Sequence, residues 1–243
     1  MFRAGGLVRL EARITRKSVR SASGQNIEVL ADLSFSLQRG ETGALIGPSG
    51  CGKSTLMRIV AGLDRHFEGE VRRPADGRIG MAFQEPRLLP WRSVDDNVRL
   101  AAPGASEEEL DALFASLGLA DHRAHYPGEL SLGLARRVAL ARAFAVRPAL
   151  LLLDEPFVSL DAPLARQLRG DLRRLVEKSK MITLLVTHDV DEAIGLADRI
   201  FVLSARPARV LGAVSVSRPR GRMDRQEEQA IAAQIEALRG GRD

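Results

Sequence analysis

Hydrophobic and polar residues alternate with a period of two in two stretches near the start of the chain, residues 7–14 and 28–38. In the second stretch, Leu33, Phe35 and Leu37 are separated by polar positions. This alternation is typical of strands that bury one face, so both stretches are predicted to be half-buried antiparallel strands. The polar residues 18–26 between them are predicted to form a loop.

Further along the chain, short apolar runs alternate with segments of helical periodicity. Ser106 and Glu109 have the spacing of a capping box and predict a helix that ends near Gly118. Strands that alternate with helices indicate an α/β fold with a parallel, doubly wound sheet. The other predicted strands are residues 42–46, 71, 79–83, 150–153, 181–187 and 200–203, and the other predicted helices are 54–61, 94–101, 132–145, 162–177, 190–196 and an amphipathic tail at 224–238.

The composition is that of an ordinary globular protein, because 45% of the 243 residues are hydrophobic and 28% are charged. It excludes a wholly disordered or collagen-like chain, and no apolar run is long enough to predict a membrane-spanning helix. The basic first residues lack an apolar core, so no secretory signal is expected. The single cysteine, Cys51, leaves no internal disulfide and is typical of a reducing compartment.

The formal net charge of +5 is compatible with phosphate ligands, nucleic acid or anionic lipid, although a solvated arginine-rich surface is the simpler interpretation. Only four of the 36 basic residues are lysines, so a lysine at a chemically demanding position carries weight. An arginine-rich stretch from Arg206 to Arg225 is a candidate for contact with lipid headgroups, but a solvated loop and tail is favoured.

A glycine-rich segment between a predicted strand and a predicted helix matches the pattern G-x-x-x-x-G-K-[ST]. Its glycines let backbone N–H groups turn toward phosphate oxygens, and the helix start adds partial positive charge. Lys53 is predicted to reach the β- and γ-phosphates, and Ser54 to hold Mg²⁺. The surrounding order of elements argues against a chance glycine turn. The predicted phosphate-binding residues are Gly47, Pro48, Ser49, Gly50, Cys51, Gly52, Lys53, Ser54 and Thr55.

Four further side chains follow predicted strands, where ligands bind in parallel sheets. Asp154 and Glu155 end an apolar strand, so Asp154 is expected to act on Mg²⁺ and Glu155 to polarise an attacking water. Gln84 could place its amide oxygen on Mg²⁺, and His188 could bond a γ-phosphate or position that water. Taken alone, a strand that ends in acidic residues, a strand-end histidine or a strand-end glutamine is more often structural.

Six motifs in this order and spacing resemble the ATP-binding subunit of ABC transporters across about residues 7–215. They are GPSGCGKST, Gln84, the stretch LSLGLARRVALARA that begins at Leu130, LLLLDEP, the Ser159-Leu160-Asp161 segment and His188. The stretch GRIGMAFQEPRLLPW, residues 77–91, further resembles the nitrate, sulfonate and taurine importer subfamily.

The resemblance implies a P-loop NTPase core, an N-terminal antiparallel β subdomain and an inserted helical subdomain. It implies a single ABC ATPase domain, with the core and β subdomain at residues 1–84 and 146–215, the helical subdomain with its signature segment at 85–145, and a tail helix at 216–243.

The resemblance also implies ATP and Mg²⁺ as cofactors and roles for individual residues. Two copies would dimerise head to tail, with each ATP between the P-loop of one copy and Ser131 and Gly133 of the other. Asp161 would stabilise the dimer, Glu155 would be the general base and His188 a switch. Gln84 and the helical insertion would couple the nucleotide state to a membrane subunit.

The implied partners are two multi-span membrane permeases and, indirectly, a periplasmic or extracellular solute-binding protein; no nucleic acid is expected. The implied place is peripheral, on the cytoplasmic side of the cell's inner membrane. The implied cargo is a small anion such as nitrate, a sulfonate or taurine.

The sequence departs from the family pattern in two places. Leu132 and Leu134 stand in a signature segment that usually reads Leu-Ser-Gly-Gly followed by Gln or Met, so turnover could be altered. The adenine-stacking aromatic residue is replaced by Val19, which predicts weaker or less selective base binding. Cys51 is either a reactive thiol at the phosphate site, protected from alkylation by MgATP, or a small residue that fits there; the second interpretation is favoured.

Three other functions are weighed against this one. A soluble ABC-type ATPase that acts on nucleic acid or ribosomes would suit the basic charge, but such proteins usually carry two cassettes or a long coiled coil. A small-molecule P-loop kinase would have no use for the signature segment. A slow, regulatory nucleotide-binding subunit stays open because of Leu132.

Overall fold

The computed structural model describes residues 9–21, 24–75, 77–216 and 223–240. The chain forms two compact units, one of residues 1–75 and 182–243 and the other of residues 76–181. We call them unit 1 and unit 2. The sequence predicts a different division of the chain, based on motifs and not on compactness: residues 1–84 with 146–215, residues 85–145 and residues 216–243. That division stays a prediction. Residues 7–8 of the first predicted strand, and 217–222 and 241–243 of the tail, lie outside the described residues.

Unit 1 begins with an antiparallel sheet of three strands, β1 (Arg9–Arg20), β2 (Asn26–Gln38) and β4 (Glu68–Arg72), in the order β2-β1-β4. Leu10 lies opposite Leu37, and Ile14 opposite Leu33, and these side chains are almost wholly buried. The predicted alternation therefore places one face of the sheet in the core, because successive side chains of a strand point to opposite sides.

The predicted loop at residues 18–26 is too long, because β1 continues to Arg20 and β2 begins at Asn26. Ser18 to Arg20 extend the antiparallel ladder with β2 past a register shift between Lys17 and Ser18. Lys17 is only 5% exposed, and its ammonium bonds the Asp64 carboxylate and the His66 carbonyl oxygen. A polar strand forms here because backbone pairing and a buried ion pair replace the apolar burial that the pattern lacked.

The second layer of unit 1 is a group of parallel strands with β3 (Thr42–Ile46) between β7 (Ile182–Thr187) and β8 (Arg199–Leu203). Every residue of β3 and β7 is buried, as expected for parallel strands covered on both faces. The helices of this unit are α1 (Lys53–Val60), α6 (Val190–Leu196) and α7 (Arg225–Gly240).

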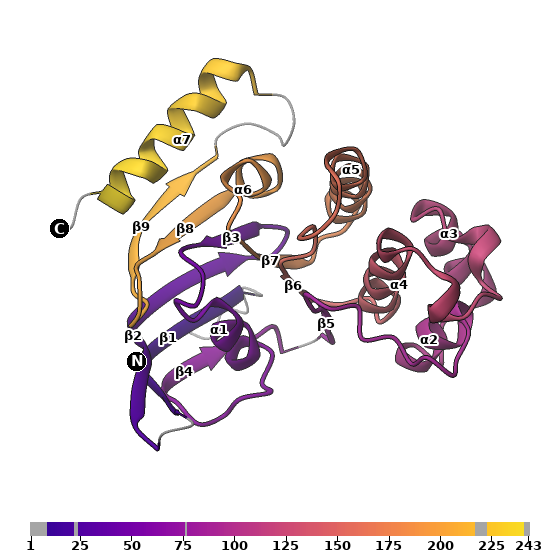
Figure 1. The fold of residues 1–243 in the computed structure, drawn as a ribbon, viewed down its shortest axis with the longest axis horizontal. Helices are drawn as coiled ribbons and strands as arrows, with labels where there is room; N and C mark the ends of the chain where they lie inside the picture. Colours follow the sequence, from indigo (N-terminus) through magenta and orange to yellow (C-terminus); the bar gives the residue numbers. More distant parts are fainter. Residues whose placement is uncertain (1–8, 22–23, 76, 217–222, 241–243) are drawn as a thin grey trace. The chain divides into compact units, whose positions relative to one another are not determined.

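One strand of unit 1 was not predicted. β9 (Val210–Ser215) pairs antiparallel with β8, and α7 runs alongside it (Figure 1). β9 shows no regular alternation of buried and exposed positions, which explains why it was missed. A Cβ atom at Gly212 would lie 2.6 Å from Leu238 Cδ2, so α7 packs directly on the backbone of β9. The tail helix is therefore a packing element of unit 1.

Unit 2 contains two parallel strands, β5 (Ile79–Ala82) and β6 (Leu150–Asp154), and four helices. The helices are α2 (Val94–Ala101), α3 (Glu107–Ser116), α4 (Leu132–Ala145) and α5 (Ala162–Lys178), with short 3₁₀ turns at Ala120–His122 and Pro127–Glu129. Ser106 and Glu109 form the predicted capping box at the start of α3. Together with unit 1, these strands and helices confirm the predicted α/β class with an N-terminal antiparallel sheet.

Helix α4 is the buried centre of unit 2 and contacts α2, α3 and β5. Its Arg137 donates to the Leu117 carbonyl oxygen at 2.8 Å and pairs with Asp171 of α5 at 2.5 Å, and both charged side chains are 7% exposed. Both bonds come from the same guanidinium nitrogen, Nη1, and they satisfy the buried charge of Arg137 between α4 and α5. In the part of the chain that the structure describes, no helix is both long and apolar enough to cross a bilayer.

Candidate functional site

The predicted phosphate-binding segment of unit 1 lies between β3 and α1, in the strand–loop–helix order that its motif requires. Gly50 and Gly52 have φ values of 73° and 127°, which side-chain-bearing residues rarely adopt. A Cβ atom at Gly52 would lie 2.7 Å from Val29 Cγ1 of β2. Glycine is therefore required at position 52 both by the turn and by close packing on the antiparallel sheet.

The Lys53 side chain is hydrogen-bonded to the backbone of this loop. It is 5% exposed, and its Nζ donates to the carbonyl oxygens of Gly47 at 2.8 Å and Pro48 at 2.9 Å. An ammonium group has three donors, so it can hold the loop closed and still donate to a phosphate oxygen. Gly52 is the N-cap of α1 and provides no side-chain cap, so the first N–H groups of the helix, around Ser54 and Thr55, provide partial positive charge.

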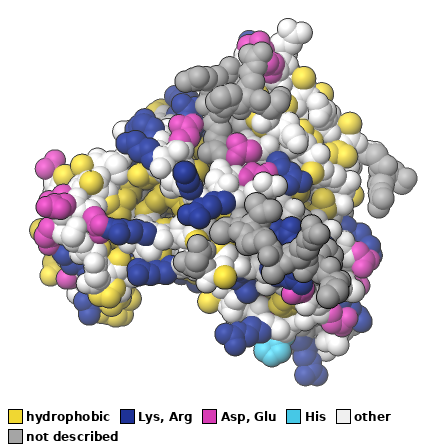
Figure 2. Space-filling model, turned by 180° about the vertical axis from the view of Figure 1, so that it is seen from behind, with side chains coloured by type: hydrophobic (Ala, Val, Ile, Leu, Met, Phe, Trp, Pro, Cys, Tyr) yellow, Lys and Arg dark blue, Asp and Glu magenta, His cyan; other side chains and the backbone are white. Residues whose placement is uncertain are grey.

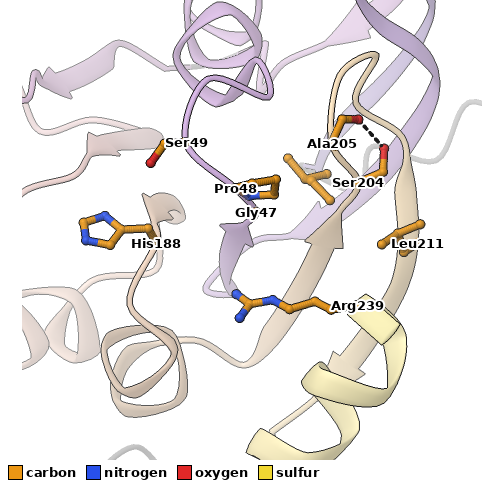
Figure 3. Close-up of a pocket in the computed structure, with 9 residues that line it drawn as sticks. Gly47, Pro48, Ser49, His188, Ser204, Ala205, Leu211 and Arg239 are labelled. Carbon is orange, nitrogen blue, oxygen red and sulfur yellow. Dashed lines mark hydrogen bonds between the residues drawn. The ribbon is translucent and has the colours of Figure 1, made fainter. Parts of the chain in front are cut away.

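His188 lies beside the same loop because of strand register. Ile46, the last residue of β3, pairs with Thr187, the last residue of β7, so Gly47 and His188 leave adjacent strands at the same level. They line a pocket of about 480 Å³ in which Figure 3 shows His188 below Ser49. Its other lining residues are Pro48, Leu203, Ser204, Ala205, Leu211 and Arg239. The structure thus brings the predicted histidine and the predicted phosphate loop together.

Asp154 and Glu155 lie in unit 2, where β6 ends. Asp154 is 6% exposed, and Glu155 has a φ of 46°, in the left-handed region. Such a conformation in a residue with a side chain is strained, and strain of this kind is concentrated at functional sites. Ala82 pairs with Leu153, so Gln84 follows β5 beside the segment that carries the two acidic residues.

The chemistry of the proposed metal ligands fits Mg²⁺. Ser54, Gln84 and Asp154 offer hydroxyl, amide and carboxylate oxygens, which are hard donors of the type that this ion prefers. Asp154 is a nearly buried carboxylate at the carboxyl end of β6, the end of a parallel strand at which ligands bind. No group of three or more His, Cys, Asp or Glu side chains that could hold a metal occurs among the described residues.

The signature segment opens α4. The Ser131 Oγ atom accepts from the Leu134 N–H at 3.3 Å and caps the helix, while its own hydroxyl proton remains a donor. Gly133 packs against α5, since a Cβ atom there would lie 2.4 Å from Leu164 Cδ2. Leu132 is 45% exposed, so the residue that departs from the family pattern presents an apolar side chain at the helix start.

Asp161 is the N-cap of α5 and accepts from the Leu164 N–H at 2.8 Å. It lies in the segment after β6 that also contains Ser159, with a φ of 63°. Asp161 is exposed, so one carboxylate oxygen can cap the helix while the other faces outward. Unit 2 thus contains Asp154, Glu155, Gln84 and the predicted partner-facing residues Ser131, Gly133 and Asp161.

Two arginines near the site were not predicted to act there. Arg206, assigned from sequence to a solvated arginine-rich stretch, donates to the Gly50 carbonyl oxygen at 2.5 Å and so touches the phosphate loop. Arg136 of α4 donates to the carbonyl oxygens of Glu155 and Pro156. No sequence pattern indicates either contact, because both contacts join segments that are far apart in the chain.

The remaining predictions concern exposed or small side chains. Arg209 pairs with Asp32, whereas Arg218, Arg220 and Arg222 of the same stretch lie outside the described residues. On the face seen in Figure 2, lysine and arginine side chains are widely spread, with acidic residues among them.

Val19, the expected equivalent of an adenine-stacking residue, is a 37% exposed position of β1. Cys51 is 2% exposed, which favours its interpretation as a small residue that fits the loop.

The sequence is similar to that of a known protein family. The family model described as ABC transporter matches residues 30–158. The chain is similar to aliphatic sulfonates import ATP-binding protein SsuB 2 of Burkholderia lata, with 45% identity over 88% of this chain and 81% of that protein. It is 42% identical to the protein of the same name from Pseudomonas syringae pv. tomato, over 88% of this chain and 91% of that protein.

A solved structure of similar fold is the dimeric, post-hydrolysis state of the ATP-binding cassette MJ0796 bound to ADP and Pi. Its TM-score is 0.73 and its identity 28%, over 86% of this chain and 99% of that chain. The matched family model spans more than half of the sequence, and the sulfonate relatives cover most of it. The chain therefore belongs to the ABC transporter family, as one of its ATP-binding, ATP-hydrolysing subunits.

Proposed function

We propose that this chain energises a membrane importer for a small anionic solute of the sulfonate class. The observation that carries the proposal is the extent of the similarity: 45% identity to a sulfonate import subunit extends over 88% of the chain and is not confined to nucleotide motifs. The subfamily-like stretch at residues 77–91 supports the same class of cargo, in which nitrate and taurine are the chemically related alternatives.

ATP is bound by the phosphate loop of unit 1. The backbone N–H groups of Ser49 to Thr55, at the loop and the start of α1, surround the phosphates, and Lys53 donates to the β- and γ-phosphates. Because Lys53 is already held by two loop carbonyls, its ammonium is positioned before the nucleotide arrives. Such positioning reduces the entropic cost of binding.

Ser54, Gln84 and Asp154 would hold Mg²⁺. The ion supplies charge neutralisation for the phosphates when bound. Asp154 contributes the carboxylate, and its burial at the end of β6 limits competition from water for that charge.

Glu155 is the general base for hydrolysis. Its carboxylate takes a proton from the water that attacks the γ-phosphorus in line, while the γ-phosphate leaves the β-phosphate oxygen. Lys53 and His188 donate hydrogen bonds to the charge that develops on the transferring group. His188 is supported in this role by its place beside the phosphate loop in unit 1.

A second copy of the chain completes the site. The hydroxyl of Ser131 and the first N–H groups of α4 from that copy face the γ-phosphate, with Asp161 stabilising the contact. The similarity to dimeric cassette structures supports this arrangement. The dimer binds two multi-span permeases from the cytoplasmic side, and a solute-binding protein outside the cell membrane delivers the anion.

The test is to capture the tagged chain from native membranes in mild detergent and identify its partners by mass spectrometry. The expected result is a multi-span permease, and ATP hydrolysis by the reconstituted complex that rises when a sulfonate-loaded binding protein is added. A Lys53→Ala chain captured in parallel serves as the control, because it should retain the permease without hydrolysis. Recovery of only soluble proteins or nucleic acid would contradict the importer assignment.

A further inference from the structure

Arg136 of α4 connects the signature helix to the backbone that carries Glu155. Its guanidinium Nη1 donates to the Pro156 carbonyl oxygen at 3.0 Å and to the Glu155 carbonyl oxygen at 3.3 Å. The residue is 6% exposed, so these bonds form away from competing water. Charged donors make stronger hydrogen bonds than neutral ones, and a buried charge needs such partners.

The bonded segment requires this support. Glu155 has a φ of 46°, a left-handed conformation that residues with side chains disfavour. Conformations of this kind persist only where surrounding contacts impose them. The two bonds from Arg136 act on the carbonyl oxygens at and directly after the strained residue, so they fix the direction in which the Glu155 side chain leaves the backbone.

The same helix begins at the signature segment. Ser131 is the N-cap of α4, and Arg136 lies five residues later, which is roughly 7.5 Å along a helix axis. A helix is rigid over that distance, so a displacement at Ser131 is transmitted to Arg136 and on to the backbone of Glu155.

We propose that Arg136 is a positioning residue for Glu155, so that the carboxylate is correctly aimed only when α4 is in place. This inference rests on the proposed role of Glu155 as general base. Arg136 itself touches neither nucleotide nor water in this account; it acts through the Glu155–Pro156 backbone.

The adjacent Arg137 provides a matched control. It lies on the same helix and is equally buried, but it bonds the Leu117 carbonyl oxygen and the Asp171 carboxylate rather than the segment after β6. A substitution there tests the cost of losing a buried guanidinium from α4 without loosening Glu155.

The experiment measures kcat, KM for ATP, nucleotide affinity and Tm for Arg136→Gln, Arg136→Lys and Arg137→Gln. Arg136→Gln is expected to lower kcat on the order of tenfold while KM and ATP affinity stay within about twofold, because only the orientation of the base changes. Arg136→Lys should recover part of kcat, since an ammonium can still donate to one carbonyl. Arg137→Gln should lower Tm and leave the kcat of the folded protein unchanged.

The double variant that carries Arg136→Gln and Glu155→Gln separates the positioning role of Arg136 from the general-base role of Glu155. If Arg136 acts through Glu155, adding Arg136→Gln to Glu155→Gln leaves the residual hydrolysis rate unchanged. Wild-type kcat in Arg136→Gln, or equal losses of kcat in the Arg136 and Arg137 variants, would overturn the positioning role. Substantial hydrolysis by Glu155→Gln alone would instead reject Glu155 as the base, whatever the Arg136 variants do.

Discussion

Gly133 in the first turn of α4 lies so close to Leu164 in the first turn of α5 that a Cβ atom fits there only if the end of the Leu164 side chain moves. A Cβ atom at position 133 would come within 2.4 Å of Leu164 Cδ2. The glycine of the signature segment therefore has a packing role in addition to the role that family resemblance assigns to it. It allows the first turns of α4 and α5, whose N-caps are Ser131 and Asp161, to pack closely together.

Gly133→Ala tests this packing. The substitution forces Leu164 to move, and overpacking of this kind costs about 1–3 kcal/mol. We expect a lower Tm and slower ATP hydrolysis, because the start of α4 is displaced. Leu164→Ala added to Gly133→Ala should restore part of both by making room for the new methyl group. A double variant as impaired as Gly133→Ala alone would show that the glycine is needed for another reason.

Leu132→Gly tests the departure from the family segment. Leu132 is 45% exposed at the first position of α4, so the loss of stability should be at most about 1 kcal/mol. We expect faster ATP turnover, because an apolar side chain is removed from the surface that we propose faces the γ-phosphate bound to the second copy. Leu100→Gly, in the last turn of α2, is the control for a similarly exposed leucine. Equal turnover of Leu132→Gly and the unmodified chain would mean that Leu132 does not limit the rate.

Cys51 is expected to react slowly with alkylating reagents in the folded protein, because its side chain is 2% exposed. Cys51→Ala should bind ATP and hydrolyse it nearly normally, since a small residue suffices at this position. Labelling kinetics followed by mass spectrometry, with and without MgATP, provide the measurement. Rapid labelling that MgATP prevents would instead support a reactive thiol at the phosphate site.

Asp95 of α2 is expected to make unit 2 less stable in acid. Burial alone would raise the pKa of Asp95, but hydrogen bonds and charge from Arg99 and Arg123 outweigh it and hold the pKa below its ordinary value. Because the folded pKa is the lower one, Asp95 contributes stability above the unfolded value of about 3.9, and this contribution is lost as the pH falls through the folded pKa.

Asp95→Asn should therefore be less stable than the unmodified chain at neutral pH and lose less stability on acidification below about pH 4. Urea unfolding at a series of pH values gives the free energies to compare. Asp96→Asn, a neighbouring and exposed acidic position in the same helical turn, is the control. If the free energy of unfolding depends on pH in the same way for Asp95→Asn and the unmodified chain, the ion pairs of Asp95 with Arg99 and Arg123 contribute nothing to stability.

The elements with strong periodicity or clear boundaries were predicted well. The bounds of α2, α4 and α6 agree with the expected residues 94–101, 132–145 and 190–196. Ser93, Ser131 and Asp189 cap these helices, so local chemistry fixes their starts. β1 beyond Lys17 and β9 were missed because their pairing depends on partner strands, which a local pattern does not reveal.

The candidate site was predictable where one motif carries the chemistry. The strand, the glycine loop and Lys53 are adjacent in the chain, so their arrangement follows from local sequence. Arg136 and Arg206 could not be predicted, because each bonds a backbone carbonyl of a distant segment and any residue has a carbonyl. Only the fold shows which arginine meets which loop.

The most direct test of the account is a single-turnover and steady-state comparison of the unmodified chain with Glu155→Gln. We expect Glu155→Gln to bind MgATP with nearly normal affinity, to lose on the order of 10²–10⁴-fold in hydrolysis and to accumulate as an ATP-bound dimer in size-exclusion chromatography. Hydrolysis at an undiminished rate, with no ATP-dependent dimer, would contradict it.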